Sequence, residues 1–428
     1  MLYERWAKVA AARRNEFALR DLASSRRWTF GELFDAGERT SVPCPSGFCH
    51  PQGHGSEFIL TLLCGWREKK FILPLEIGQS APAIPTPPAW CVHLKSTSAT
   101  TGASRAVGFT ETQLAADAES IVATMGLRAD WPNLGVISMA HSYGFSNLVL
   151  PLLLHGIPLI LSPSALPEVL KRAAEGECHS TLAAVPALWR VWHEADSIPA
   201  NVRLAISAGA PLPLELERAV YNTKGLKIHN FYGSSECGAI AYDASDTPRT
   251  DEACVGAPMR EVNLSVNETG LLTVRSNAVG ETYWPAPQTT LGNDCFETSD
   301  LAELKDGLVF WRGRASEIIN VAGRKVSPLA IEHALTEHPQ VRACLVFGVP
   351  ALDPGRAEDV VACVVAESTA RPDILRDFLS TRIAPWQMPR DWWFVDSLQP
   401  NSLGKLSRTA WRQKYLERAA TESQTQTT

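Results

Sequence analysis

A regular alternation of apolar strands and amphipathic helices constrains the fold of this chain most. Short apolar segments at 136–139, 159–161, 182–185 and 204–207 are predicted strands, and helical patterns at 145–154, 167–175 and 213–221 separate or follow them. Strands that alternate with helices predict a largely parallel sheet covered by helices. The predicted class is therefore α/β, with layered sheets in a large N-terminal domain.

The pattern changes twice further along the chain. Between 255 and 311 the strands shorten and turns multiply, which predicts a β-rich subdomain. After Gly313 an α+β rhythm begins, with predicted strands at 343–349 and 360–366 and a helix at 372–383. We predict one domain over residues 1–314 and a small α+β domain over residues 315–428, whose polar tail is disordered from about residue 418.

Before the alternating region, we expect a helix at 3–20 and a loop rich in proline, glycine and serine at 41–55. Cys44, Cys49, His50 and His54 in this loop superficially have the spacing of a metal site, but the surrounding sequence matches no standard zinc pattern. We therefore expect free thiols and solvent-exposed histidines there.

Composition excludes several classes of protein. The 428 residues include 40 Lys and Arg against 46 Asp and Glu, a net charge of −6, so no global charge favours nucleic acid. Ten cysteines without a C-x-x-C pair predict a reduced, cytoplasmic protein. The longest apolar region, at 148–161, contains His155, Gly156 and two prolines and is too short to span a membrane.

Two polar runs follow predicted strands. The first, from Ser96 to Arg105, is rich in hydroxyl groups, which can hold phosphate oxygens together with backbone N–H groups, but it lacks the Walker A spacing. The second, from Asn230 to Glu236, combines an aromatic ring, a glycine, hydroxyls and a carboxylate, which suits a base, a phosphate and Mg²⁺. It is not the G-x-S-x-G elbow of hydrolases.

Two further runs follow in order, Thr298-Ser299-Asp300-Leu301 with Trp311-Arg312-Gly313-Arg314, and Gly404-Lys405-Leu406-Ser407-Arg408. In this order and spacing, the four runs resemble the adenylate-forming superfamily of acyl-CoA synthetases, peptide-synthetase adenylation domains and luciferases. The first resembles T-S-G-T-T-G-x-P-K, with Ala99, Ser104 and Arg105 at the Gly, Pro and Lys positions. The second resembles Y-G-x-T-E, with Ser235 at the Thr position. Because the first run begins at about residue 97, the region before it is shorter than is usual in the superfamily.

The resemblance implies a two-step reaction. A carboxylate attacks the α-phosphate of ATP, pyrophosphate leaves, and a thiol then displaces AMP from the acyl-AMP. Catalytic roles fall on Lys405, Glu236 and Thr101, and Glu236 is also the implied Mg²⁺ ligand. The implied nucleotide-binding residues are Thr97, Ser98, Thr100, Gly102, Arg105, Gly209, Ala210, Asn230, Tyr232, Gly233, Ser234, Ser235, Asp300 and Arg314.

The resemblance also implies a mobile small domain. Its hinge falls on Ser316, where the superfamily usually has Asp or Lys, and Ala322 and Gly323 fall on the loop that completes the thiol tunnel. The implied acid-binding residues are His141, Tyr143, Ser207 and Gly233. The segment 139–144 contains no carboxylate to hold an α-amine, which disfavours an amino acid as substrate.

The chain therefore has three candidate functions. The first is an AMP-forming ligase that joins an aryl or fatty acid to coenzyme A. The second delivers the acyl group to the phosphopantetheine arm of a carrier protein, and the third binds nucleotide without turnover as a regulatory protein. The retained Glu236, Asp300, Arg314 and Lys405 argue against the third. The resemblance leaves a homodimer open.

Overall fold

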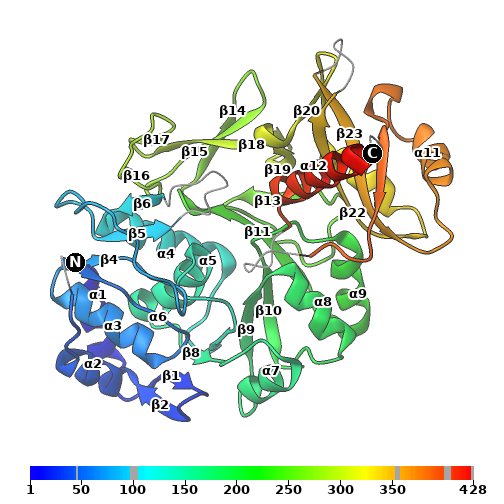
Figure 1. The fold of residues 1–428 in the computed structure, drawn as a ribbon. Helices are drawn as coiled ribbons and strands as arrows, with labels where there is room; N and C mark the ends of the chain where they lie inside the picture. The colour runs from blue at the N-terminus through cyan, green and yellow to red at the C-terminus, as the bar shows by residue number, and fades with distance from the viewer. Residues whose placement is uncertain (45–46, 97–104, 352–356, 400–405, 426–428) are drawn as a thin grey trace. The chain divides into compact units, whose positions relative to one another are not determined.

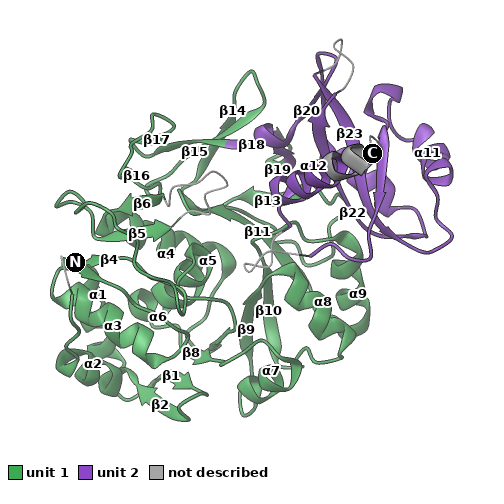
Figure 2. Cartoon of the chain, in the orientation of Figure 1, with its two compact units in different colours: residues 1–298, 304–310 green, residues 299–303, 311–428 purple. Residues whose placement is uncertain are grey.

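The computed structural model describes residues 1–44, 47–96, 105–351, 357–399 and 406–425. The chain forms two compact units (Figure 2). Unit 1 comprises Met1–Thr298 and Leu304–Phe310, and unit 2 comprises Ser299–Glu303 and Trp311–Thr428.

A parallel sheet organises unit 1 (Figure 1). Its parallel strands lie in the spatial order β11, β10, β9, β7, β8, β1. Their bounds are β1 Phe17–Asp21, β7 Asn133–Gly135, β8 Leu159–Leu161, β9 Ser180–Ala184, β10 Val202–Ser207 and β11 Ile228–Ser234. The helices between them are α5 Ser142–Gly144, the π-helix η2 Phe145–Val149, α6 Leu150–His155, α7 Pro167–Ala174, α8 Pro186–Glu194 and α9 Leu214–Lys224. The predicted α/β class is confirmed.

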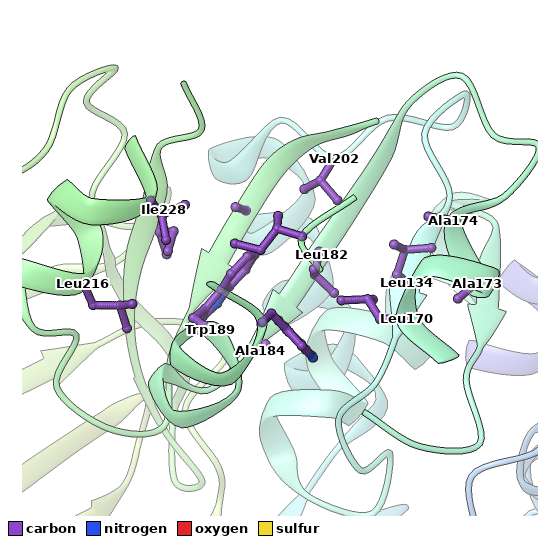
Figure 3. Close-up of a cluster of buried hydrophobic side chains, with 14 of the residues drawn as sticks. Leu134, Leu170, Ala173, Ala174, Leu182, Ala184, Trp189, Val202, Leu216 and Ile228 are labelled. Carbon is purple, nitrogen blue, oxygen red and sulfur yellow. The ribbon is translucent and has the colours of Figure 1, made fainter. Parts of the chain in front are cut away.

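Buried side chains explain why this sheet forms. Trp189 and Trp192 are fully buried at the centre of one core cluster, with their rings edge to face and centroids 5.4 Å apart. Leu182, Ile228 and Leu216 pack into the same cluster from β9, β11 and α9 (Figure 3). Burial of aromatic side chains such as these contributes a large share of a core's stability.

A second, five-stranded sheet also belongs to unit 1. It contains β3 Phe48–Cys49, β4 Phe71–Ile72, β5 His93–Ser96, β6 Ala106–Phe109 and β16 Thr282–Trp284. The N-terminal helices α1 Leu2–Ala12, α2 Phe30–Arg39 and α3 Ser56–Arg67 lie together beside β1 and β2 Arg26–Thr29 (Figure 1), and α4 Glu111–Met125 follows β6. The β-rich part of unit 1 contains β12 Gly238–Tyr242, β13 Cys254–Pro258, β14 Asn263–Val266, β15 Leu271–Arg275, β17 Leu291–Gly292, and segments of β18 Cys295–Lys305 and β19 Leu308–Arg314.

Unit 2 has its own α+β core. Its strands β22 Val341–Pro350, β23 Glu358–Ala366 and β24 Asp391–Phe394 form a three-stranded sheet, and β20 Ile319–Val321 pairs with β21 Arg324–Val326. Its helices are η3 Ala315–Glu317, α10 Pro328–Thr336, α11 Pro372–Ser380, η4 Pro385–Gln387 and α12 Arg408–Thr425. Val346, Ala362 and Leu375 are fully buried between the sheet and the helices. The helix α12 continues to Thr425, so the prediction of a disordered tail from about residue 418 is wrong up to that residue.

Other boundaries also differ from the predictions. The first helix ends at Ala12, not 20, because Phe17–Asp21 pairs with both β2 and β8 as a strand. The strand predicted at 136–139 lies at Asn133–Gly135, since its neighbour β8 ends at Leu161 and leaves the following residues without a partner strand. The loop predicted at 41–55 contains the short strand β3. Among the described residues, no helix is both long and apolar enough to cross a lipid bilayer.

Candidate active site

The carboxyl ends of β9 and β10 hold a tyrosine. The Oη atom of Tyr143 lies 3.4 Å from the carbonyl oxygens of both Ala184 and Ile206. Burial raises the pKa of this phenol, so it remains protonated and donates. Its ring lies beside that of Phe231, with centroids 5.9 Å apart. Tyr143 and Phe231 thus lie at the edge of the sheet where open α/β folds bind ligands.

Ser207 ends β10 at the same edge. Its side chain is fully buried, and within the described parts of the chain its Oγ has no hydrogen-bond partner. A buried hydroxyl without a partner costs free energy, so a bound polar group or water at this position would stabilise the site. The role of Ser207 toward the acid stays a prediction.

The helix that carries Tyr143 contains an insertion. Pro151 has no N–H to donate to the carbonyl of Asn147, and the buried side-chain amide of Asn133 donates to that oxygen instead, at 3.1 Å. The preceding residue, Leu150, donates back to Phe145 across five positions, which makes Phe145–Val149 a π-helix. Such insertions are frequent at functional sites. The sequence pattern indicated a regular helix here and missed it.

The turn after β11 carries Glu236. Its Oε1 accepts a hydrogen bond from the Tyr283 hydroxyl at 3.1 Å, and its carbonyl accepts from the backbone N–H of Gly280 at 2.8 Å. The N–H of Glu236 donates to Ser234 Oγ at 3.2 Å. Burial, reinforced by the Glu236 charge, raises the pKa of Tyr283. The carboxylate is thus held in one place, and carboxylate oxygens are ligands that Mg²⁺ prefers. Sequence reasoning did not find Tyr283.

One contact joins this turn to the tyrosine helix. Ser142 Oγ lies 3.3 Å from Ser235 Oγ. Gly144 packs directly on Ser138, because a Cβ at Gly144 would lie 2.0 Å from the Ser138 carbonyl oxygen. The segments 141–143 and 234–236 therefore contact each other through Ser142 and Ser235.

The histidine of this cluster has an acidic neighbour that the sequence did not reveal. His141 Nε2 lies 3.1 Å from Glu76 Oε1, and Ser138 donates a short hydrogen bond to the same oxygen. Glu76 and Ser138 also line a pocket of about 170 Å³ with His54, Ser162 and others. Glu76 follows β4 in the N-terminal region, far from His141 in sequence, so only the tertiary structure brings them together.

Family models match both parts of the chain. The model of the AMP-binding enzyme matches residues 66–292, and that of the AMP-binding enzyme C-terminal domain matches residues 330–405. The chain belongs to the AMP-binding enzyme family. The predicted resemblance to adenylate-forming enzymes is confirmed.

Curated relatives of this AMP-binding enzyme are named as CoA synthases or ligases. The chain is 27% identical over 345 residues to a feruloyl-CoA synthase from Amycolatopsis sp., covering 75% of this chain and 69% of the relative. It is 28% identical over 351 residues to a 4-hydroxybenzoate–CoA/benzoate–CoA ligase from Rhodopseudomonas palustris, covering 74% and 64%.

Solved structures share the fold. ATP-bound MatB from Rhodopseudomonas palustris superposes with a TM-score of 0.85 at 19% identity, covering 97% of this chain and 99% of that one. The o-succinylbenzoate CoA synthetase MenE from Bacillus subtilis, in complex with its acyl-adenylate intermediate OSB-AMP, has a TM-score of 0.79 at 18% identity, covering 95% and 97%.

Unit 2 of this AMP-binding enzyme contains several of the other predicted residues. Asp300 Oδ1 and Arg314 Nε lie 3.4 Å apart, with the aspartate largely buried and the arginine half-exposed. Ser316 is exposed in η3. Ala322 and Gly323 form the exposed turn between β20 and β21, both with positive φ, of 51° and 82°. Two successive residues with positive φ are typical of a tight hairpin turn.

The remaining predicted site residues lie either outside the described residues or in unit 1. Thr97, Ser98, Thr100, Thr101, Gly102 and Lys405 lie outside the described residues. Asn230 is buried and its side chain donates to the Cys254 carbonyl at 3.3 Å. Arg105, Gly209, Ala210 and Gly233 are exposed, and Tyr232 is half-buried. Their roles toward nucleotide stay predictions.

The cysteine and histidine cluster of the N-terminal region differs from expectation. His50 and His54 are half-buried, not solvent-exposed, because their rings bind the carbonyls of Leu73 and Gly135, at 3.0 Å and 2.9 Å. Cys49 is buried and its thiol donates to the Thr61 carbonyl. Within the described residues, no group of three or more His, Cys, Asp or Glu side chains is placed to hold a metal ion.

Proposed function

We propose that this chain activates a carboxylic acid with ATP and transfers the acyl group to coenzyme A. The observation that carries the proposal is the cluster at the carboxyl edge of the parallel sheet, in which the held carboxylate of Glu236 lies beside Ser235, Ser142 and the Tyr143 helix. In open α/β folds, ligands bind at this edge of the sheet. An aryl acid is the first candidate, because the Tyr143 and Phe231 rings lie beside each other there, tilted by 48° with centroids 5.9 Å apart, and two relatives are named for aryl acids.

In the first step, a carboxylate oxygen of the acid bonds to the α-phosphorus, and the bond to the pyrophosphate oxygen breaks. Both reactants are anionic, so positioning and charge neutralisation lower the barrier. Lys405 and Arg105 are the proposed cations, and Asp300, supported by Arg314 at 3.4 Å, is the proposed ribose ligand. Mg²⁺ bound by Glu236 would supply further positive charge to the phosphates.

In the second step, the thiol attacks the acyl carbon and AMP leaves with the bonding electrons. We propose that residues 315–428 turn about Ser316 between the steps, bringing Lys405 to the first and the Ala322–Gly323 turn to the second. Positive φ at both turn residues keeps this hairpin narrow, which suits entry into a tunnel. A carrier protein's phosphopantetheine arm presents the same thiol and stays an alternative acceptor.

The test is acid-dependent exchange of labelled pyrophosphate into ATP over a panel of aryl and fatty acids. We expect exchange with at least one acid, followed by thioester formation when coenzyme A is added. No exchange across the panel, with nucleotide still bound, would favour the non-catalytic function. Thioester formation only with a carrier protein would favour the second ligase function.

The Lys405→Ala variant separates the two steps. Adenylation should fall about 10²–10³-fold, the usual effect of removing one group that stabilises a transition state. Thioester formation from a supplied acyl-AMP should change little. Equal losses in both steps would contradict the proposed rotation.

A further inference from the structure

A buried ionic cluster lies beneath the candidate site. Lys95 Nζ lies 3.3 Å from Asp117 Oδ2, and both side chains are 2% exposed. Ser146 Oγ donates to the same carboxylate oxygen at 2.6 Å and accepts from Lys95 Nζ at 3.3 Å. We name Lys95, Asp117 and Ser146 the Asp117 cluster. The other carboxylate oxygen, Oδ1, accepts the backbone N–H of Ala239 at 3.1 Å.

Each partner of Asp117 belongs to a different segment of the site. Lys95 lies on β5 opposite Val107 on β6, so it anchors the two strands that flank the predicted phosphate-binding run. Ser146 lies in the π-helix that directly follows His141 and Tyr143. Ala239 is the second residue of β12, the strand that follows Glu236. One carboxylate therefore contacts all three segments.

The packing around Asp117 leaves little room. Gly238 has a φ of 67°, and a Cβ there would lie 2.2 Å from Asp117 Oδ1. The Lys95 ammonium also lies 4.6 Å from the centre of the Phe109 ring. The turn that carries Glu236 can approach this closely only because residue 238 is glycine.

An ion pair is not the most stabilising way to fill such a space. Replacing a buried ion pair with apolar residues of similar volume is often neutral or stabilising, since desolvation offsets the attraction. Directional hydrogen bonds, in contrast, fix the positions of the groups that they join. The hydrogen bonds of the Asp117 cluster therefore suit the fixing of the segments that they join better than a role in the stability of the fold alone.

We propose that Asp117 is a positioning residue for ATP activation, holding the Glu236 turn, the Tyr143 helix and the strands of the phosphate-binding run in register. This rests on the function proposed above. Asp117 does not touch substrate. A misplacement of about 1 Å at a reacting group can reduce the rate about 10²-fold, so loosening this carboxylate should reach the chemistry.

The experiment compares variants of the full chain by calorimetric titration with Mg·ATP, pyrophosphate exchange and thermal unfolding. Ser146→Ala removes one hydroxyl of the cluster but leaves the Lys95–Asp117 ion pair in place, and it should raise the Kd for Mg·ATP about threefold. Asp117→Asn should raise it about tenfold or more, because charged hydrogen bonds are stronger. The matched control is Ser197→Ala, which removes an equally buried hydroxyl that donates to the Trp192 carbonyl and should leave Kd unchanged.

The double variant Lys95→Met, Asp117→Asn separates positioning from stability. Without an unpaired charge, it should unfold at a higher temperature than Asp117→Asn, yet its weak nucleotide affinity should persist. Recovery of ATP affinity together with stability would overturn the proposal, as would unchanged affinity in Ser146→Ala and Asp117→Asn.

A second readout distinguishes this proposal from the general function. Thioester formation from a supplied acyl-AMP, which lacks the β- and γ-phosphates, should fall less in Asp117→Asn than pyrophosphate exchange does. Equal losses would assign Asp117 a merely structural role. Failure of the wild-type chain to bind Mg·ATP at all would overturn both proposals, whereas wild-type exchange with unaffected variants would overturn only this one.

Discussion

Two buried ionic clusters hold opposite ends of the same β-hairpin, β11–β12. The Asp117 cluster contacts the turn end, through Ala239. At the open end, Lys227 immediately precedes β11 and Asp243 immediately follows β12, and their charged groups lie 2.5 Å apart. Lys227 also binds Glu217, which in turn pairs with Arg249 Nε at 2.8 Å. We name Lys227, Glu217, Asp243 and Arg249 the Lys227 cluster.

Both clusters consist of buried ion pairs and hydrogen bonds, but they contact different elements of the fold. Arg249 donates to the carbonyls of Leu212 and Cys254, each at 2.7 Å, so the Lys227 cluster ties α9 to the strands behind the site. The Asp117 cluster instead touches the segments that carry Glu236 and Tyr143. The effect of a buried ion pair on function therefore depends on which helices and strands it contacts. Disrupting the Lys227 cluster should mainly affect folding, and disrupting the Asp117 cluster should mainly affect ATP.

The largest effect is expected from Lys227→Met. It leaves Glu217 and Asp243 buried with one cation fewer, and breaking a buried ion pair costs about 3–5 kcal/mol of stability. Chemical unfolding should measure this loss in the free energy of unfolding. The Kd for Mg·ATP of the folded protein should stay within about twofold of wild type. A large rise in Kd with little loss of stability would reverse the comparison.

Glu236→Gln should have the opposite profile. It removes the charge proposed to hold Mg²⁺ but keeps an oxygen for the Tyr283 hydroxyl, which donates at 3.1 Å. Pyrophosphate exchange should fall about 10²–10³-fold, as for loss of one transition-state contact. The melting temperature should change little. Tyr283→Phe is the milder companion and should reduce exchange less, whereas full activity in Glu236→Gln would remove this residue from the mechanism.

A pair of glycine variants compares the same two ends of the hairpin. Gly238→Ala adds backbone strain at a φ of 67° and a Cβ only 2.2 Å from Asp117, so we expect a loss of about 1–3 kcal/mol and weaker ATP binding. Gly225→Ala is the matched control, since Gly225 ends α9 at a φ of 63° and a Cβ there meets nothing within 4 Å. It should cost about 1 kcal/mol and leave ATP affinity unchanged. Urea unfolding and calorimetric titration measure both quantities.

The smallest effect concerns acid stability. Burial alone would raise the pKa of Asp243, but hydrogen bonds from Lys227 and Ser245 outweigh it and lower that pKa from 3.8. A lowered folded-state pKa stabilises above the unfolded value and is lost as the pH falls through the folded value. The melting temperature should therefore drop below about pH 4, and this drop should be shallower in Lys227→Met, which removes the main cause of the shift. An identical acid profile in both proteins would show that Lys227 does not set this pKa.

Much of the fold follows from local pattern. The short apolar segments and intervening helices indicate the parallel sheet, and β8 is found at the predicted residues 159–161. The first helix is predicted too long because its pattern cannot show that Phe17–Asp21 finds partner strands on both sides. The π-helix is missed because the sequence pattern does not show the tertiary contact there, the Asn133 amide that donates to the carbonyl of Asn147 in place of the absent Pro151 N–H.

The candidate site, like the fold, could be predicted only in part from the sequence. The sequence alone determined the family, through four runs whose order and spacing resemble adenylate-forming enzymes, and that resemblance implied Glu236, Tyr143 and Ser207 as site residues. Only the tertiary structure decided what holds them. Tyr283, Glu76 and Asp117 lie 47, 65 and 122 residues from Glu236, His141 and Ala239, which they contact. A supporting contact needs a partner in space rather than a spacing along the chain, and so it leaves no pattern in the sequence.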